Sequence, residues 1–343
     1  MIAEKVKILA IGNRLLKSRN IFSVQEKIQL QLSDKAIFWS VSNFDNQVLR
    51  FLDMLQMWPR KIRKADFVFI DVFSTRAFWF AWIFGLLSAP FKARLVLILH
   101  GGNLPFRYQK STRMVRLLLS KADNLITPSN YLKEFFALQG FNATTINNSI
   151  DIAEYPFKHR TKIRPAFMAI RGFGKPYNPL LTLRAFKIVL SNYPQAKLLL
   201  LGNPDEYYYH EVIRFIANNN LNDSVTVKNK IPKADWINIS QNYDVMISNP
   251  DIDNTPVSII EGQALGMCII SSNVGGISFI LNHEHDALLV EQGDVIGLSN
   301  AMMRLLKDEQ LCRNLSENAR IAARKYDWAS VRLQWLELLG IRS

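Results

Sequence analysis

Hydrophobic and polar positions along the chain form two alternating kinds of segment. Short apolar runs are typical of buried strands, and the stretches between them repeat apolar residues every three or four positions, as on one face of a helix. The strand candidates of the first half are residues 6–11, 36–40, 67–72, 95–100 and 124–127. Those of the second half are residues 166–170, 197–201, 224–227, 245–248 and 268–271. This alternation predicts an α/β protein with two doubly wound parallel sheets.

The most apolar stretch, residues 77–100, resembles a membrane span at first sight. Pro90, Lys92 and Arg94 interrupt it, and a span needs about 20 consecutive apolar residues. We therefore expect a buried or interfacial helix followed by a strand. A second distinctive stretch, residues 154–165, combines two prolines with several charges and is the expected linker between two domains.

Composition adds size and charge to this picture. A chain of 343 residues, with 49% hydrophobic and 21% charged residues, can form two ordinary globular domains. Residues 1–163 hold 24 Lys and Arg against 11 Asp and Glu, a net charge of +13, whereas residues 164–343 hold 18 of each. An excess confined to one half indicates an anionic partner there, either nucleic acid or a membrane surface.

The cysteines and the N-terminus bear on the compartment. Cys268 and Cys312 are the only cysteines and show no metal-ligand spacing, so we expect a reduced, cytosolic protein without structural disulfides or zinc. The apolar run at residues 6–11 is short for a signal peptide and has no cleavage site of the A-x-A kind. It is interpreted as the first strand, ended by Gly12.

Two carboxylates, Asp253 and Glu261, bracket the expected start of a helix. Pro256 suits the first helical position, with Asn254 or Thr255 as the cap before it. Gly266 supplies the stop, ahead of a buried strand.

The first N–H groups of this helix, those of Val257 and Ser258, would be unpaired and able to bind an anion such as a phosphate. An acid, an anion-binding helix end and a second acid together predict a nucleotide-sugar site. The alternative is local, because Ser258 and Glu261 also have capping-box spacing, and a Glu in the first turns often only complements the helix dipole.

Residues 253–261 resemble the E-x7-E signature of family-4 retaining glycosyltransferases, and residues 272–277 resemble the turn that follows it. The resemblance implies the GT-B fold, with two Rossmann-like doubly wound parallel-sheet domains facing a central cleft. It implies an acceptor-binding domain at residues 1–160, a donor-binding domain at 161–325, and a C-terminal helix at 326–343 that crosses back. Asp253 would act at the transferred sugar, in place of the family's first Glu. Glu261 would bind the ribose hydroxyls of the donor nucleotide.

Other candidates follow strands in the first half. An imidazole such as that of His100 can hydrogen-bond a sugar hydroxyl, and Gly101 lets a ligand approach the backbone; alternatively, His100 only caps the strand. The resemblance places His100 near the donor sugar. It also places Gly12, in the loop Gly12-Asn13-Arg14, near the diphosphate and the acceptor.

Arg171 and Lys175 lie on a glycine-containing loop after the first strand of the second half. Together they could reach one diphosphate, Arg as a two-pronged donor and Lys as a point charge. The alternative is that both are merely solvated; the resemblance to the family's Arg…Lys pair favours the diphosphate. Asp251-x-Asp253 has the spacing of a metal-binding motif, but the longer match already assigns Asp253, so we expect no metal site.

The resemblance therefore implies a retaining glycosyltransferase of cell-envelope polysaccharide biosynthesis. We expect a nucleotide-diphosphate sugar as its donor substrate, a saccharide or lipid-linked saccharide as its acceptor, and no cofactor. Residues 44–58 are expected to form a helix with one apolar face, and the run at residues 60–64 is cationic. This pattern is typical of proteins that lie on anionic lipid, so we expect a cytoplasmic, peripheral membrane protein. That apolar face is Val48, Phe51, Leu52 and Leu55, and a second basic cluster is Arg107, Lys110, Arg113, Arg116 and Lys121.

Several other functions are alternatives to this prediction. The basic helix face could be simply solvated. A GT-B epimerase acting on a nucleotide sugar, and an inactive GT-B scaffold, both remain open. An oxidoreductase is disfavoured because no G-x-G-x-x-G follows the first strand. Nucleic-acid binding is disfavoured because the half with the motif is neutral and recognition motifs are lacking.

Overall fold

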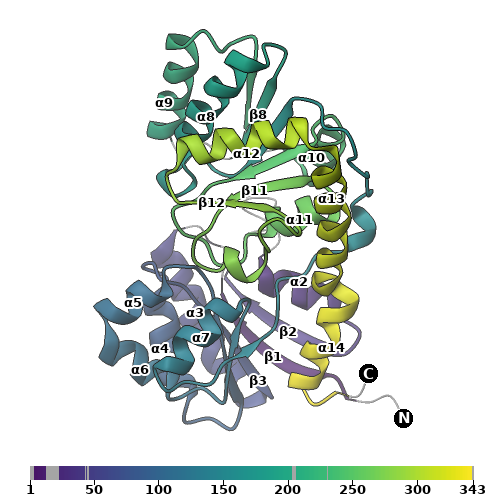
Figure 1. Cartoon of the computed structure of the whole chain (residues 1–343). Coiled ribbons are helices and arrows are strands. Elements are labelled where there is room, and N and C mark those ends of the chain that lie inside the picture. The colour runs from purple at the N-terminus through teal and green to yellow at the C-terminus, as the bar shows by residue number, and fades with distance from the viewer. Residues whose placement is uncertain are drawn as a thin grey trace. The chain divides into compact units, whose positions relative to one another are not determined.

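The computed structural model describes residues 4–12, 23–42, 44, 46–202, 206–229 and 231–341 (Figure 1). The chain forms two compact units. The N-terminal unit consists of Met1–Asn148 and Ala329–Ser343, and the C-terminal unit of Ser149–Trp328. Each contains a six-stranded parallel sheet covered by helices, so the predicted α/β class with two parallel sheets is confirmed.

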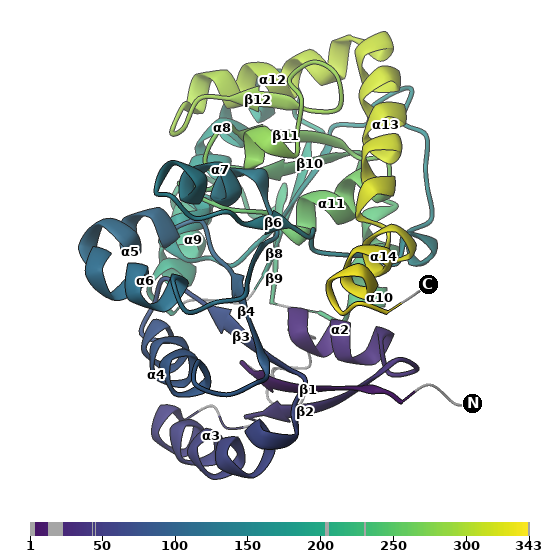
Figure 2. The same cartoon turned by 90° about the horizontal axis from the view of Figure 1, so that it is seen from below.

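The sheet of the N-terminal unit has the strand order β2-β1-β3-β4-β5-β6. Helices α3 to α7 cover one face, and α2 and α14 the other (Figure 2). The strands are β1 (Val6–Ile11), β2 (Ala36–Val41), β3 (Phe67–Val72), β4 (Arg94–Leu99), β5 (Asn124–Thr127) and β6 (Thr144–Thr145). The helices are α2 (Val24–Gln31), α3 (Gln47–Lys61), α4 (Phe78–Ser88), α5 (Leu104–Lys110), α6 (Thr112–Leu119), α7 (Asn130–Leu138) and α14 (Trp328–Leu338).

Both faces of this sheet are apolar, because helices cover both and successive side chains point to opposite sides. Ile70 belongs to the buried cluster that includes Phe78 and Phe84 of α4. Its neighbour Phe69 packs on Trp335 of α14, with ring centroids 5.8 Å apart. The end of the chain therefore supplies part of the core of the N-terminal unit.

The sheet of the C-terminal unit has the order β12-β11-β10-β7-β8-β9. Its strands are β7 (Ala166–Ile170), β8 (Lys197–Gly202), β9 (Val225–Asn229), β10 (Val245–Ser248), β11 (Cys268–Ser272) and β12 (Leu288–Val290). Its helices are α8 (Pro179–Asn192), α9 (Glu206–Asn218), α10 (Lys233–Ser240), α11 (Val257–Ala264), α12 (Val295–Lys307) and α13 (Glu309–Ala323). Along β8, Leu198 and Leu200 join the cluster under α8 and α12, whereas Leu199 and Leu201 join the cluster under α10 and α11.

Residues 154–165, the expected linker, belong to the C-terminal unit. Tyr155 and Arg160 are buried there, and Asp244 at the start of β10 accepts hydrogen bonds from Lys158 (2.8 Å) and Arg164 (2.8 Å). Two of the charges in this segment, Lys158 and Arg164, are therefore paired with a buried carboxylate. The division between the units lies instead between residues 148 and 149.

Helix α3 buries one edge of its predicted apolar face. Phe51 packs on Phe80 and Phe84 of α4, at centroid distances of 6.2 and 5.9 Å. Val48, Leu52 and Leu55 are exposed, although the helical period of 3.6 residues places them on the same side of the helix as Phe51. The predicted apolar face is therefore only partly buried, with one edge packed against α4 and the other open to solvent. No helix within the described ranges is long and apolar enough to cross a bilayer.

Candidate functional site

Each sheet reverses its strand order once. In the C-terminal unit the chain runs from β7 through β8 to β9 and then returns to place β10 on the other side of β7. In the N-terminal unit, β2 and β3 flank β1 in the same way. Connections leave such a point in opposite directions, and ligands of open α/β sheets bind there, beyond the carboxyl ends of the strands.

Arg171 and Asp253 meet at this point in the C-terminal unit. Arg171 follows β7, Asp253 follows β10, and the guanidinium donates to the carboxylate. The guanidinium also lies over the ring of Tyr177, 4.4 Å from its centroid. Its Nε is buried and has no hydrogen-bond partner in the described part of the chain, so the group has donor capacity to spare.

Glycines of the following turn fix the loop that carries Asp253. The second oxygen of the Asp253 carboxylate accepts from the N–H of Asn254 (2.8 Å), and the backbone oxygen of Asp253 accepts from the N–H of Gly276 (2.9 Å). A Cβ at Gly276 would lie 1.9 Å from the backbone oxygen of Asn254. Only glycine permits this approach, so residues 275–276 pack directly against the backbone of residues 253–254.

Helix α11 starts one residue later than the sequence predicted. Pro256 is the N-cap and Val257 the first helical residue. The N-cap position is therefore occupied by Pro256 and not by Asn254 or Thr255, and no side-chain cap bond is seen there among the described residues. An N-cap proline has no side-chain acceptor to offer the first turn.

The helix end keeps its capacity to bind an anion. The N–H of Ile259 bonds to the oxygen of Pro256 (3.0 Å), whereas those of Val257 and Ser258 bond to no residue that the structure describes. The Ser258 hydroxyl is buried, also without a partner there. Three donors at a helix N-terminus favour a phosphate-like ligand.

Glu261 is held by a residue that the sequence analysis missed. The Tyr155 hydroxyl donates to Glu261 Oε1 at 2.7 Å. Burial, followed by the negative charge of Glu261, raises the pKa of Tyr155, so the hydroxyl stays protonated and remains a donor. Tyr155 lies in the segment expected to be a linker, and no local pattern identifies its partner.

Lys175 is not brought to a partner. It lies in a short 3-10 helix, Lys175–Tyr177, is exposed, and forms no ion pair with any described side chain. The loop itself is anchored, because Asn178 donates to Asp251 Oδ1 (2.6 Å) and the Asp251 N–H to the oxygen of Pro176 (2.8 Å). The ammonium therefore extends into solvent from a fixed base, close in sequence to Arg171.

In the N-terminal unit, His100 and Gly12 are both neighbours of Asp71. His100 Nε2 lies 2.8 Å from Asp71 Oδ1, and the imidazole stacks on Phe73 at 5.1 Å. A Cβ at Gly12 would lie 2.3 Å from Asp71 Oδ2. Gly101 has a φ of +85°, which favours glycine.

Asp71 was also missed, although a signal existed. It is the one charged residue of the otherwise apolar strand β3, near its carboxyl end. The other predicted residues of the first loop, Asn13 and Arg14, lie outside the described residues. Within the described ranges, no three His, Cys, Asp or Glu side chains cluster as metal ligands.

The family model of glycosyl transferases group 1 matches residues 151–322, half of the chain. The chain belongs to this family. The matched range contains Arg171, Asp253 and Glu261, whereas Gly12 and His100 lie outside it.

Known glycosyltransferases and a synthase match over about half of the chain or less. The chain is 27% identical over 186 residues to the N-acetyl-alpha-D-glucosaminyl L-malate synthase of Bacillus anthracis, covering 51% of this chain and 47% of that protein. It is 27% identical over 144 residues to the N,N'-diacetylbacillosaminyl-diphospho-undecaprenol alpha-1,3-N-acetylgalactosaminyltransferase of Campylobacter jejuni, covering 42% and 37%. The matched stretches thus span less than half the length of these relatives.

Solved structures of the same fold align over nearly the whole chain. Anabaena Alr3699/HepE in complex with UDP has a TM-score of 0.75 at 16% identity, covering 98% of this chain and 100% of that one. The sucrose-phosphate synthase tll1590 from Thermosynechococcus elongatus has a TM-score of 0.79 at 15% identity, covering 98% of each. At such identities the likeness shows the fold alone, and that fold is GT-B.

Proposed function

We propose that this group 1 family member is a retaining glycosyltransferase whose donor is a nucleotide-diphosphate sugar. The observation that carries the proposal is the set of donors at the carboxyl end of the C-terminal sheet. Arg171 has a buried, unpartnered Nε, and the N-terminus of α11 at Val257 and Ser258 has no cap within the described residues. Both suit a diphosphate.

Breaking the bond between the sugar and the diphosphate leaves negative charge on the leaving phosphate. Donors that are fixed before the reaction stabilise such charge without reorganising. Arg171, Lys175 and the N–H groups of Val257 and Ser258 would do so, without a metal ion or cofactor. In the structure Arg171 forms an ion pair with Asp253. A bound diphosphate would replace the Asp253 carboxylate as the partner of the guanidinium.

The remaining residues would hold the rest of the donor. Glu261, of which one oxygen accepts a hydrogen bond from Tyr155, would accept hydrogen bonds from the ribose hydroxyls. The carboxylate freed from Arg171, that of Asp253, would lie at the transferred sugar. His100 and Gly101, with Gly12, would contribute to sugar and acceptor binding.

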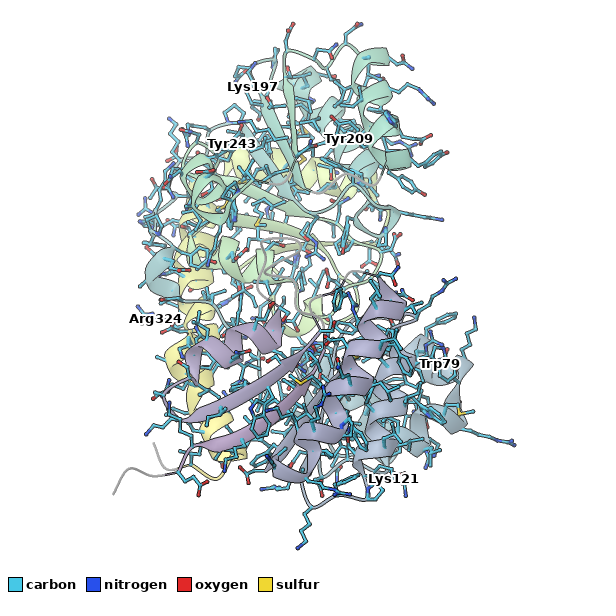
Figure 3. All side chains as sticks on the ribbon, turned by 180° about the vertical axis from the view of Figure 1, so that it is seen from behind. Trp79, Lys121, Lys197, Tyr209, Tyr243 and Arg324 are labelled. Carbon is cyan, nitrogen blue, oxygen red and sulfur yellow. The ribbon has the colours of Figure 1, made fainter. Side chains whose placement is uncertain are left out.

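The proposed acceptor is a saccharide or a lipid-linked saccharide of the cell envelope, reached at the cytoplasmic face of the membrane. The name of the Campylobacter relative includes a diphospho-undecaprenol carrier. In this chain, α3 exposes Val48, Leu52 and Leu55 ahead of the cationic residues 60–64. On α4, Trp79 is also exposed and lies at the outer margin of the N-terminal unit (Figure 3).

The test begins with a thermal-shift screen of UDP-, GDP- and ADP-sugars, because a ligand that binds only the folded state raises its stability. With the donor identified, Arg171→Ala and Lys175→Ala are each expected to lower turnover by about 10²–10³-fold, the usual effect of losing one such donor. Arg304→Ala is the matched control. Arg304 lies on α12 and pairs with Glu284, so its loss should leave turnover unchanged.

Each outcome separates the candidate functions. Near wild-type turnover in either site variant contradicts the diphosphate assignment. A product formed from the donor alone, without an acceptor, indicates the epimerase. Donor binding without any turnover indicates an inactive scaffold.

A further inference from the structure

Asp71 and His100 form a buried pair at the strand-order reversal of the N-terminal sheet. Asp71 lies near the carboxyl end of β3 and His100 directly after β4, and both are buried. Gly12, directly after β1, lies next to the Asp71 carboxylate. These are the carboxyl ends of adjacent strands, where open α/β sheets bind ligands.

We propose that Asp71 is a positioning residue that holds His100 in one tautomer, with Nδ1 presented as a hydrogen-bond acceptor to a ligand hydroxyl. The identity of that ligand as a sugar rests on the proposed glycosyl transfer. The positioning itself rests only on the geometry of the N-terminal unit.

The tautomer follows from the chemistry of the pair. An ionised carboxylate accepts hydrogen bonds and cannot donate them. Because Asp71 Oδ1 lies 2.8 Å from His100 Nε2, Nε2 must carry the proton. In a neutral imidazole the other nitrogen is then an acceptor, and Nδ1 forms no hydrogen bond with any residue that the structure describes.

The orientation of the His100 imidazole is also restricted. The N–H of His100 bonds to the backbone oxygen of Val72 at 2.8 Å, which ties its backbone to the neighbouring strand. Phe73 stacks on the imidazole at an interplanar angle of 22°. A substitution at Gly12 would displace the Asp71 carboxylate, since the added Cβ would lie 2.3 Å from Oδ2.

The surroundings favour a hydroxyl over a phosphate. A phosphate would bring negative charge to the Asp71 carboxylate and would need a donor where Nδ1 offers an acceptor. A ligand hydroxyl can instead donate to Nδ1. A small pocket lined by Asp71, Phe73, Met54 and Phe80 opens beside the Asp71 carboxylate.

The first experiment reads the tautomer directly. Protein with ¹⁵N-labelled histidine is studied by long-range ¹H–¹⁵N correlation, which distinguishes protonated from unprotonated ring nitrogens. His100→Gln identifies the His100 signals. We expect a protonated Nε2 and a bare Nδ1 in the wild type, and a mixture of tautomers in Asp71→Asn. A wild-type ring protonated on Nδ1 would overturn the proposal.

The second experiment measures turnover with the donor found in the screen. Asp71→Asn is expected to lower kcat roughly 10–100-fold and to change the donor KM less than about twofold, as for partners that orient a functional histidine. Glu317→Gln is the matched control, because Glu317 lies 3.0 Å from the ring of the exposed His159. It should leave both constants unchanged.

The results of these experiments distinguish the positioning role of Asp71 from the proposed glycosyl transfer. Unchanged kcat in Asp71→Asn, in a protein that transfers sugar, overturns the positioning role and leaves the transferase intact. No transfer from any donor contradicts the transferase, while the tautomer measurement still decides the role of Asp71. Titration with inorganic phosphate should leave the His100 signals in place, and a phosphate-induced shift would overturn the hydroxyl assignment.

Discussion

Glu261 and His100 are each held by a partner from a distant part of the sequence. Tyr155 is 106 residues from Glu261, and Asp71 is 29 residues from His100. In both pairs the partner is buried. Such partners restrict the orientation of a binding side chain before the ligand arrives, which lowers the entropic cost of binding.

Tyr155→Phe tests this at the residue scale. The ring stays in its buried site, but Glu261 loses a 2.7 Å hydrogen bond. We expect the donor KM to rise about 5–10-fold, as for the loss of one hydrogen bond worth about 1 kcal/mol, with little change in kcat.

Tyr326→Phe is the control for Tyr155→Phe. Tyr326 is equally buried in the same core cluster, and the structure shows no bond from its hydroxyl to Glu261. An equal KM for Tyr155→Phe and the wild type would mean that Glu261 does not need this partner.

At this scale the sequence revealed charges but not their partners. The position of Arg171 at the carboxyl end of the sheet could be predicted because it directly follows an apolar strand, whereas Asp253 was identified by its resemblance to a family motif. The Arg171–Asp253 ion pair could not be predicted, because it depends on β7 and β10 being neighbours. Tyr155 gave no signal, since an aromatic residue among prolines and charges fits a loop equally well.

At the scale of elements, continuous apolar runs were reliable guides. Strands such as β1, β3 and β7 have the predicted bounds. Strands that are buried on both faces are continuous apolar runs, so the ends of the run mark the ends of the strand. Residues 144–145 and 288–290 were missed as strands, since runs of two or three residues carry no period. The burial of Phe51 depends on α4, which the pattern of α3 alone cannot show.

Helix α3 provides a prediction about lipid binding. Leu52 and Leu55 are 53% and 44% exposed, so Leu52→Gln/Leu55→Gln should fold normally. We expect its binding to vesicles of anionic lipid to fall about 10-fold or more, because each leucine inserted into the interface contributes through several CH₂ groups at about 0.8 kcal/mol each. Co-sedimentation measures this.

Leu333→Gln on α14 is the matched control for the α3 variant, since Leu333 is equally exposed. It should bind vesicles as the wild type does. Wild-type binding at high salt should also fall, because the cationic residues 60–64 are screened. No binding of the wild type at low salt would contradict a membrane surface on α3.

At the scale of the whole molecule, Asp244 holds residues 158–164 within the C-terminal unit. Burial alone would raise the pKa of this carboxyl, but hydrogen bonds from Arg164 and Lys158 outweigh it and lower the pKa to about 2. A carboxyl whose pKa is lower in the folded state stabilises the fold above its unfolded pKa, about 3.9. That stabilisation is lost as the pH falls from about 4 to 2.

Asp244→Asn should therefore be less stable than the wild type at pH 7 by roughly 2–3 kcal/mol, from about two pKa units at 1.36 kcal/mol each. The difference should shrink as the pH falls from 4 to 2. Urea denaturation at a series of pH values measures it. Asp235→Asn, on the exposed side of α10, is the control and should show no such trend. A difference that stays constant down to pH 2 would contradict the assigned pKa.

The path of the chain has a consequence for how the protein can be divided. The C-terminal unit is one uninterrupted stretch, and its two ends are joined, because Ile150 exchanges backbone hydrogen bonds with Tyr326 and Trp328 at 2.9 and 2.8 Å. A gene fragment for 149–328 would thus encode a self-contained body with adjoining termini. A fragment ending at residue 148 would instead lack Trp335 and expose one side of Phe69, and exposed apolar surface promotes aggregation. Division of this protein is therefore asymmetric: the C-terminal unit can be expressed by simple truncation, whereas the N-terminal unit requires residues 329–343 to be fused to it.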